Sequence, residues 1–381
     1  MLKCQKDSFD LDEDITYLNG AYMSPLLNKV RDAGLHALIK KSKPWSIPPT
    51  AFFDSVLYLK QLAARVIQTD QPERIAVIPS VSYGMANVAR NIKFKKGDHI
   101  VLLDKQFPSN YFIWKSLAEK HELILDIVSP PSDSNQRGPS WNEAVLKAIT
   151  PATKLVTLEH IHWADGTLFD LKAIREKTNE VGALLVVDVT QSLGAFPFDQ
   201  SVFKVDALVG AAYKFMMGPY AMGVAYYGPA FDHGTPIEEN WINKKGSEVF
   251  EKLLDYESDY KPGAARYSMG EQSQFIHVPM QIAAFEQLLE WGIDNIQSYC
   301  KGIVDTILPS LKENGIWIEE QPWRANHLFG IRPAQGITVS LKEKLLDNHI
   351  YVSYRSDTIR ISPNVYNSPE DLIKLVSTII E

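Results

Sequence analysis

Short apolar runs alternate with longer, helix-length segments through the middle of the chain. The runs cover residues 74–78, 100–103, 123–128, 154–158, 184–187, 207–212 and 223–227. Apolar runs of this length are typical of strands buried on both faces, and the longer segments between them are typical of crossover helices. The pattern therefore predicts an α/β fold, with a mainly parallel, seven-stranded sheet between two layers of helices.

The two ends of the chain show a different pattern. Residues 17–21 (YLNGA) predict a short strand that closes on a glycine turn, and helices are expected over 26–41 and 51–69. A polar loop is expected over 129–138 and a surface excursion over 231–243. Further helices are expected over 272–291, 295–314 and 368–380, with strands near Trp317, Leu328, Tyr351 and Ile359. This C-terminal part predicts a second, smaller α+β domain.

The composition is that of an ordinary globular protein, with 45% hydrophobic and 22% charged residues in a chain of 381. The net charge is −7 without a basic block, which argues against nucleic-acid binding. The polar, acidic start of the chain argues against a signal peptide, and no apolar run reaches the ~18 residues of a membrane span. Cys4 and Cys300 match no metal spacing. We therefore expect a cytoplasmic protein with no metal site and no nucleic-acid or membrane partner.

Two candidate catalytic side chains, Asp188 and Lys214, follow predicted strands. In parallel α/β sheets, ligands gather outside the carboxyl ends of the strands. A carboxylate and an amine held there suit pyridoxal 5'-phosphate (PLP), because the amine forms a Schiff base and the acid keeps the pyridine nitrogen protonated. A structural ion pair explains the same spacing, and the spacing alone leaves both interpretations open.

Two further motifs follow predicted strands and have both a functional and a structural interpretation. The segment 79–84 (PSVSYG) opens a predicted helix, whose free N–H groups suit a phosphate; alternatively, Ser80 or Ser82 is an ordinary N-cap. Phe107 suits stacking on a planar cofactor, although most aromatic residues at such positions belong to the core.

Histidine and arginine side chains give weaker signals. His160 and His162 are two apart at the end of a predicted strand, so both side chains can point to one side. A hydrogen-bonding role for one of them competes with a purely structural role. Arg266 and Arg360 could each bind an amino-acid carboxylate through a bidentate fork, or form surface salt bridges.

Taken together, these pieces resemble the class V aminotransferase superfamily of PLP-dependent enzymes, which includes cysteine desulfurases, kynureninases and isopenicillin N epimerase-like proteins. The resemblance covers nearly the whole chain, from YLNGAYMSP to IRISPNVYNSPED. It implies fold type I and a homodimer with shared active sites. It also implies an N-terminal segment (1–20) that packs on the small domain, a large PLP-binding domain (21–270) and a small C-terminal domain (271–381).

The resemblance also implies roles for individual residues. Lys214 resembles the Schiff-base lysine, Asp188 the partner of the pyridine nitrogen, and Gln191 a donor to the 3-oxygen of the ring. Arg360 resembles the arginine that grips the substrate carboxylate. The remaining expected contacts are Val81, Ser82 and Tyr213 to the phosphate, Phe107 stacked on the ring, His162 beside the 3-oxygen, Gly270 and Glu271 completing the neighbouring subunit's phosphate site, and Asn19 and Ala21 beside the substrate.

Departures from the family pattern bear on the reaction. Cysteine desulfurases carry a nucleophilic cysteine shortly before the carboxylate arginine, whereas residues 351–357 (YVSYRSD) contain none and Cys300 falls in a predicted helix. The resemblance therefore implies an aminotransferase-like or isopenicillin N epimerase-like enzyme that acts on an amino acid through a Lys214 Schiff base and a Cα carbanion. One alternative is a β-eliminating or kynureninase-like lyase, which the motif FPSN (residues 107–110) and the Tyr213–Lys214 pair favour. The other is a non-catalytic binding protein with the PLP-enzyme fold. A nicotinamide dehydrogenase is not favoured, because the sequence lacks the glycine fingerprint of dinucleotide binding.

Overall fold

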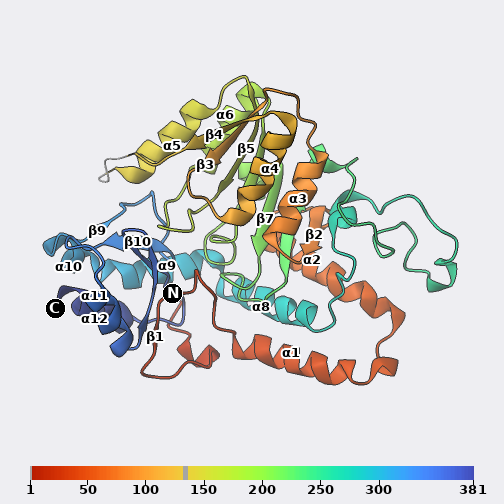
Figure 1. The fold of residues 1–381 in the computed structure, drawn as a ribbon. Coiled ribbons are helices and arrows are strands. Elements are labelled where there is room, and N and C mark those ends of the chain that lie inside the picture. The colour runs from red at the N-terminus through yellow and green to blue at the C-terminus, as the bar shows by residue number, and fades with distance from the viewer. Residues whose placement is uncertain (1, 132–135) are drawn as a thin grey trace.

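The centre of the molecule is a seven-stranded sheet, shown in Figure 1 for a computed structural model that describes residues 2–131 and 136–381. Its spatial order is β2-β8-β7-β6-β5-β3-β4. Strand β8 runs antiparallel to both of its neighbours, and the other neighbouring pairs are parallel. The predicted α/β fold with a mainly parallel sheet is confirmed. The strands are β2 (Ile75–Ile78), β3 (His99–Leu103), β4 (Ile124–Val128), β5 (Thr153–Glu159), β6 (Leu184–Asp188), β7 (Ala207–Ala211) and β8 (Gly223–Tyr227).

Helices cover both faces of this sheet, which explains why its strands are mostly apolar. Alternate strand residues point into two separate hydrophobic clusters. One cluster includes α3 (Val81–Asn91) and α4 (Phe112–His121). The opposite cluster includes α2 (Asp54–Val66), α5 (Arg137–Ala148), α6 (Leu171–Val181) and α8 (His277–Trp291). Buried apolar surface of this extent is the main stabilising contribution to such a domain.

Several predicted helices have different bounds in the structure; those expected over 51–69 and 272–291 are α2 (Asp54–Val66) and α8 (His277–Trp291). The helix expected over 295–314 is two helices, α9 (Ile293–Asp305) and α10 (Leu308–Glu313). Pro309 occupies the first turn of α10, where its missing N–H costs nothing, whereas inside a continuous helix it would remove a hydrogen bond. The helix expected over 26–41 begins later, as α1 (Asn28–Lys41).

The C-terminal part forms a smaller antiparallel sheet of order β12-β13-β10-β9. Helices α9, α10, α11 (Val339–Asp347) and α12 (Pro369–Ile380) accompany this sheet (Figure 1). Ser368 and Asp371 form a capping box at the start of α12, the helix expected over 368–380. The strands are β9 (Trp317–Ile318), β10 (Phe329–Arg332), β12 (Ser353–Arg355) and β13 (Thr358–Ile361).

The N-terminal segment lies against this smaller sheet. Strand β1 (Thr16–Tyr17) pairs in parallel with β11 (Ile350–Tyr351), and Asn19 forms an isolated bridge with Ser362. Helix α8 contacts α1 and α2 beneath the large sheet. The expected division into 1–20, 21–270 and 271–381 stays a prediction.

One connecting segment extends beyond the layers. Residues 228–262 carry only short 3₁₀ turns and project to the right in Figure 1, in the region of the predicted excursion. In the polar loop expected over 129–138, residues 132–135 lie outside the described residues, and α5 begins at Arg137.

Candidate active site

A cavity opens at the carboxyl ends of the central strands β5, β6 and β7, where the sequence predicts a ligand. Its volume is about 260 Å³. Six predicted site residues line this cavity, which we call the Lys214 cavity: Val81, Phe107, Asp188, Gln191, Tyr213 and Lys214. Segments far apart in the sequence therefore meet at one edge of the sheet, as the parallel topology requires.

Lys214 and Asp188 are both buried in this cavity, with 5% and 4% of their surfaces exposed. Burial, together with the positive charge of Arg360, lowers the pKa of Lys214 to about 8. Burial raises the pKa of Asp188, while the N–H of Thr190, 2.9 Å from Asp188 Oδ1, and the Lys214 charge oppose that rise. The Lys214 amine lies 5.2 Å from the centre of the Phe107 ring. An amine of lowered pKa and a carboxyl group thus share one small, enclosed site.

The residues around this pair fit PLP. Gln191 Oε1, an acceptor, is buried without a hydrogen-bond partner among the described residues, whereas Nε2, the donor expected for the 3-oxygen, donates to the Ala21 carbonyl oxygen over a long 3.4 Å. Ser80 caps α3 by accepting from the N–H of Tyr83, and Val81, at the first position of the helix, lines the cavity. Free N–H groups at such a helix start suit the phosphate of a ligand. Ser82 does not line the cavity; its hydroxyl lies 2.9 Å from that of Ser80.

The two histidines point away from the Lys214 cavity. Glu159, Ile161 and Trp163 line it, so the intervening His160 and His162 lie on the other side of the extended chain. His160 packs against phenylalanine rings, and burial lowers its pKa to about 3. His162 Nδ1 lies 3.1 Å from Asp165 Oδ1, and Asp165 raises the His162 pKa against the effect of burial. The structure thus places Trp163, rather than the expected His162, in the cavity, because side chains of an extended chain alternate in direction.

Glu159 is a cavity residue that the sequence reasoning missed. It is 2% exposed, and its two carboxyl oxygens accept from the backbone N–H groups of Phe107 (2.5 Å) and Trp163 (2.7 Å). Burial raises its pKa to about 7, and the nearby Asp188 adds to the rise. A signal was present, because Glu159 directly follows the apolar run 154–158, as Asp188 follows the run 184–187.

Arg360 on β13 lies next to the cavity rather than in its lining. It is 1% exposed, its Nη1 donates to the carbonyl oxygen of Trp163 (2.8 Å), and its Nη2 donates to Ser353 Oγ (3.2 Å). Burial, together with the positive charge of Arg355, lowers its pKa to about 9. Its Nε is buried without a partner among the described residues, so the guanidinium keeps a free donor.

The expected substrate residues Asn19 and Ala21 contact these same side chains. Asn19 Oδ1 accepts from Ser353 Oγ (2.6 Å), so Asn19 and Arg360 share Ser353. The carbonyl oxygen of Ala21 accepts from Gln191 Nε2 (3.4 Å). The N-terminal segment therefore reaches the edge of the Lys214 cavity.

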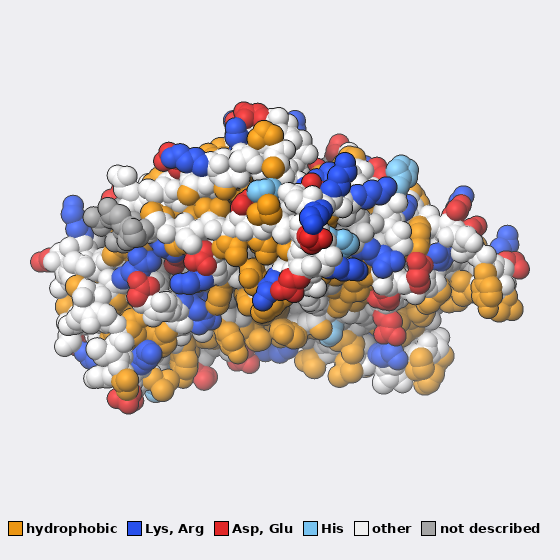
Figure 2. Space-filling model, turned by 45° about the horizontal axis from the view of Figure 1, so that its top comes forward, with side chains coloured by type: hydrophobic (Ala, Val, Ile, Leu, Met, Phe, Trp, Pro, Cys, Tyr) orange, Lys and Arg blue, Asp and Glu red, His pale blue; other side chains and the backbone are white. Residues whose placement is uncertain are grey.

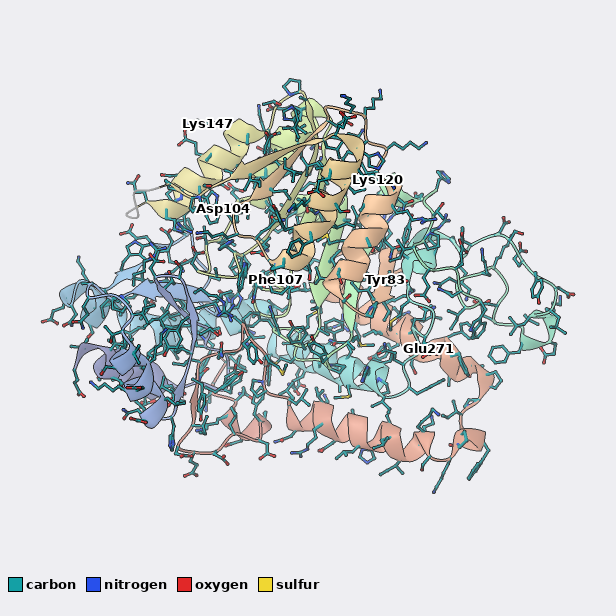
Figure 3. The ribbon with its side chains drawn as sticks, in the orientation of Figure 1. Tyr83, Asp104, Phe107, Lys120, Lys147 and Glu271 are labelled. Carbon is teal, nitrogen blue, oxygen red and sulfur yellow. The ribbon has the colours of Figure 1, made fainter. Side chains whose placement is uncertain are left out.

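Gly270 and Glu271 lie outside the Lys214 cavity. They line a separate cavity of about 560 Å³ together with Trp241 and Phe275. The N–H of Gly270 donates to Glu238 Oε1 (2.7 Å), and Tyr83 at the start of α3 donates to the other oxygen of Glu238 (3.0 Å). Figure 3 shows Glu271 well apart from Phe107 within the single chain.

The described residues hold no group of three or more His, Cys, Asp or Glu side chains that suits a metal ion. Within the same residues, no helix is long and apolar enough to cross a membrane. Cys4 and Cys300 are free thiols, and neither lines the Lys214 cavity. Burial raises the pKa of Cys300 well above the ordinary value.

Solved structures with the same fold define its class. A cysteine desulfurase of Thermococcus onnurineus NA1 superposes with a TM-score of 0.81 at 18% identity, covering 99% of this chain and 97% of that one. A cystine C–S lyase, solved with its product cysteine persulfide, superposes with a TM-score of 0.83 at 18% identity, covering 97% and 98%. The architecture is therefore the fold of PLP-dependent enzymes.

The sequence comparisons place the chain in a family within this fold class. The profile of the aminotransferase class-V family matches residues 50–375. The uncharacterized aminotransferase YcbU of Bacillus subtilis (strain 168) is 26% identical over 310 residues, which cover 79% of this chain and 77% of that protein. This chain belongs to the aminotransferase class-V family, so the predicted family and its PLP dependence are confirmed.

Proposed function

We propose that this chain is an aminotransferase-like or epimerase-like enzyme that moves a proton at the α-carbon of an amino acid with the amine of Lys214. The observation that carries the proposal is the joint burial of Lys214 and Asp188 in one cavity that suits PLP. PLP, when bound, draws electrons from the α-carbon of an amino acid. The cavity suits that chemistry because it holds an amine with a pKa of about 8 in an enclosed, mostly apolar site.

Each lining residue has a specific task in this proposal. Lys214 would hold the cofactor covalently, Asp188 its ring nitrogen, and Gln191 its 3-oxygen. Phe107 would cover one face of the ring, and the start of α3 at Val81 would hold the phosphate, with Ser82 and Tyr213 in supporting positions. Arg360 would bind the substrate α-carboxylate with its free Nε and flanking N–H groups, next to Asn19 and Ala21.

Lys214 is the group that moves the proton. The Lys214 amine must be uncharged to accept a proton. Burial lowers its pKa to about 8, so that part of the amine is uncharged near neutral pH. The substrate carboxylate held by Arg360 would direct the α-hydrogen toward this amine. Trp163 and Tyr213, which line the cavity, exclude water from the reacting atoms.

A lyase is the second candidate function. The motif FPSN and the Tyr213–Lys214 pair favour it, and a structural relative with 18% identity is described as a cystine C–S lyase. A persulfide-forming desulfurase is not favoured, because residues 351–357 contain no cysteine and Cys300 is buried away from the Lys214 cavity.

A homodimer and a cytoplasmic location belong to the same proposal. Gly270 and Glu271 lie outside their own chain's cavity, which fits a role in the neighbouring subunit's site. Exposed apolar side chains gather on and after α1, including Leu35, Ile39 and Trp45, and Figure 2 shows hydrophobic side chains along the lower edge of the molecule. Two free thiols suit a reducing compartment.

Two measurements test this function. The purified protein should take up PLP and turn yellow, and borohydride should fix the cofactor to Lys214 in a peptide map. A panel of amino acids, with and without a 2-oxo acid, then separates the reactions. Acceptor-dependent turnover means transamination, loss of optical activity alone means epimerisation or racemisation, and ammonia release without an acceptor means elimination. A protein that forms no adduct with PLP at Lys214 would contradict the proposal.

A further inference from the structure

A second cavity lies beside the Lys214 cavity, where the β12–β13 hairpin meets the loop after β5. Its volume is about 810 Å³, and Trp163 lines both cavities. Four basic side chains line it, so we call it the arginine cavity: Lys105, Arg137, Arg332 and Arg355. Figure 2 shows Lys and Arg side chains gathered with some acidic ones on the left side of the molecule, where the smaller sheet meets the larger one.

Two of these four basic groups are already neutralised. Arg137 pairs with the buried Asp165 (2.7 Å), and Arg332 pairs with Asp357 (3.2 Å) and lies over the Trp317 ring. Both arginines therefore have structural partners that account for their positions. Their charges are not available to a ligand without breaking those pairs.

Arg355 has no such partner among residues 2–131 and 136–381, which the structure describes. No carboxylate of the described residues lies within 4.0 Å of it, and its Nη1 donates to the carbonyl oxygen of its neighbour Tyr354 (2.7 Å). Its Nε is buried and has no hydrogen-bond partner among the described residues. Its guanidinium lies 5.0 Å from the centre of the Trp163 ring. A partly buried guanidinium with free donors is the arrangement that binds a carboxylate or a phosphate.

Arg355 and Arg360 lie around the same indole. The Arg360 guanidinium lies 6.0 Å from the centre of the Trp163 ring and donates to the Trp163 carbonyl oxygen. Because Trp163 lines both cavities, the two arginines beside its ring flank the passage from one cavity to the other. A substrate with one carboxylate needs one of these two arginines, which leaves the other without an anion.

We propose that the substrate carries a second anionic group, a carboxylate or a phosphate, and that Arg355 binds it in the arginine cavity while Arg360 binds the α-carboxylate. This inference rests on the proposed function and narrows the substrate class to acidic or phosphorylated amino acids. Trp163, which separates the two cavities, would pack against the chain that joins the two anionic groups.

The test measures binding of unreactive acids to the PLP-loaded protein by calorimetry. Succinate and glutarate are compared with butyrate and valerate, which have the same chain lengths and one carboxylate less. The compound 3-phosphonopropionate tests a phosphate-like second group. We expect each favoured dianion to bind at least about tenfold more tightly than its monocarboxylate, which corresponds to about 1.4 kcal/mol. The better dianion identifies whether a carboxylate or a phosphate is recognised.

Variants assign the preference to Arg355. Arg355→Gln should bring the dianion affinity down to that of the monocarboxylate, with the monocarboxylate affinity unchanged within about twofold. Arg355→Lys keeps the positive charge and should retain part of the preference for dianions over monocarboxylates. This variant tests the inference even where Arg355→Gln does not fold. Arg360→Gln should weaken both classes of acid. Lys120→Gln, at the exposed far end of α4 in Figure 3, removes an equal charge and should change neither.

Two results would overturn the inference. Equal binding of dianions and monocarboxylates by the parent protein would show that no second anion is recognised. An equal loss of both classes in Arg355→Gln would assign Arg355 to the α-carboxylate instead. Failure of the proposed function is distinguishable, because it shows as absence of a PLP adduct at Lys214, whereas failure of this inference leaves that adduct intact.

Discussion

Glu159 and Asp188 are direct neighbours in the register of the adjacent parallel strands β5 and β6, and both line the Lys214 cavity. Burial raises the pKa of each, and the Asp188 charge raises that of Glu159 further. Lys214 favours the ionised form of Asp188. Two buried neighbouring carboxyl groups oppose each other's ionisation, and Glu159, with a pKa of about 7, retains a proton to a higher pH than an ordinary carboxyl group does.

The buried proton on Glu159 predicts that stability depends on pH. The pKa of Glu159 rises from 4.5 to about 7 on folding. The contribution of protonated Glu159 to the free energy of unfolding is therefore fully present below pH 4.5 and is lost as the pH rises through 7. A shift of this size corresponds to about 3 kcal/mol. Glu159→Gln has no proton to lose, so the variant should lack this loss between pH 5 and pH 8. The measurement is urea unfolding at both pH values.

The matched control for that experiment is Glu143→Gln, an exposed carboxyl group on α5 that pairs with Lys147. This variant should keep the pH dependence of the parent protein. If Glu159→Gln also kept it, Glu159 would not be the group that binds the proton.

Lys214 should give the cofactor uptake a characteristic pH profile. An amine reacts with an aldehyde only when uncharged, so the rate of PLP uptake by the cofactor-free protein should rise about tenfold per pH unit below pH 8. Above pH 8 the rate should level off, because the pKa of Lys214 is lowered to about 8 by burial. Absorption in stopped-flow mixing measures this rate. A rate that keeps rising to pH 10 would mean that Lys214 titrates as an ordinary, exposed lysine.

Asp188→Asn separates the charge of this residue from its packing. The amide has nearly the same shape, and its oxygen can still accept the Thr190 N–H bond, so folding should be retained. Without the negative charge, turnover should fall on the order of 100-fold, a typical loss for one electrostatic group in an active site. The checks are turnover with the best substrate of the amino-acid panel and the melting temperature. Unchanged turnover would assign Asp188 a purely structural role.

The apolar runs predict the large sheet well because strands such as β2, β7 and β8 are buried on both faces, which leaves a clear sequence pattern. The same logic locates Asp188 and Lys214, since a polar residue after such a run lies at the carboxyl edge of the sheet. The cavity confirms that these two side chains come together. Their roles toward PLP stay predictions.

Other features depend on details that a run of apolar residues does not carry. The run 154–158 does not show which alternate residues after it face the cavity, so His162 was expected where Trp163 lies. Arg355 lies opposite Thr358 in the β12–β13 hairpin, but the Trp163 ring beside it is far away in the sequence. Only the folded chain shows that Arg355 has no carboxylate partner among the described residues. The break between α9 and α10 has a local signal in Pro309, which a helical periodicity alone overlooks.

Gly194 controls the backbone next to Lys214. Its φ of +98° belongs to a region that favours glycine, and a Cβ at this position would overlap the carbonyl oxygen of Phe215, the residue after Lys214. Gly194→Ala should therefore displace residues 214–216, lower the free energy of unfolding by about 3 kcal/mol, and weaken PLP binding.

Gly182→Ala is the matched control, because Gly182 also has a positive φ of +71° but faces open space. It should cost only about 1 kcal/mol and leave PLP binding unchanged. Urea unfolding and PLP titration measure both effects, and equal losses in the two variants would mean that contact with Phe215 is not what requires glycine at position 194.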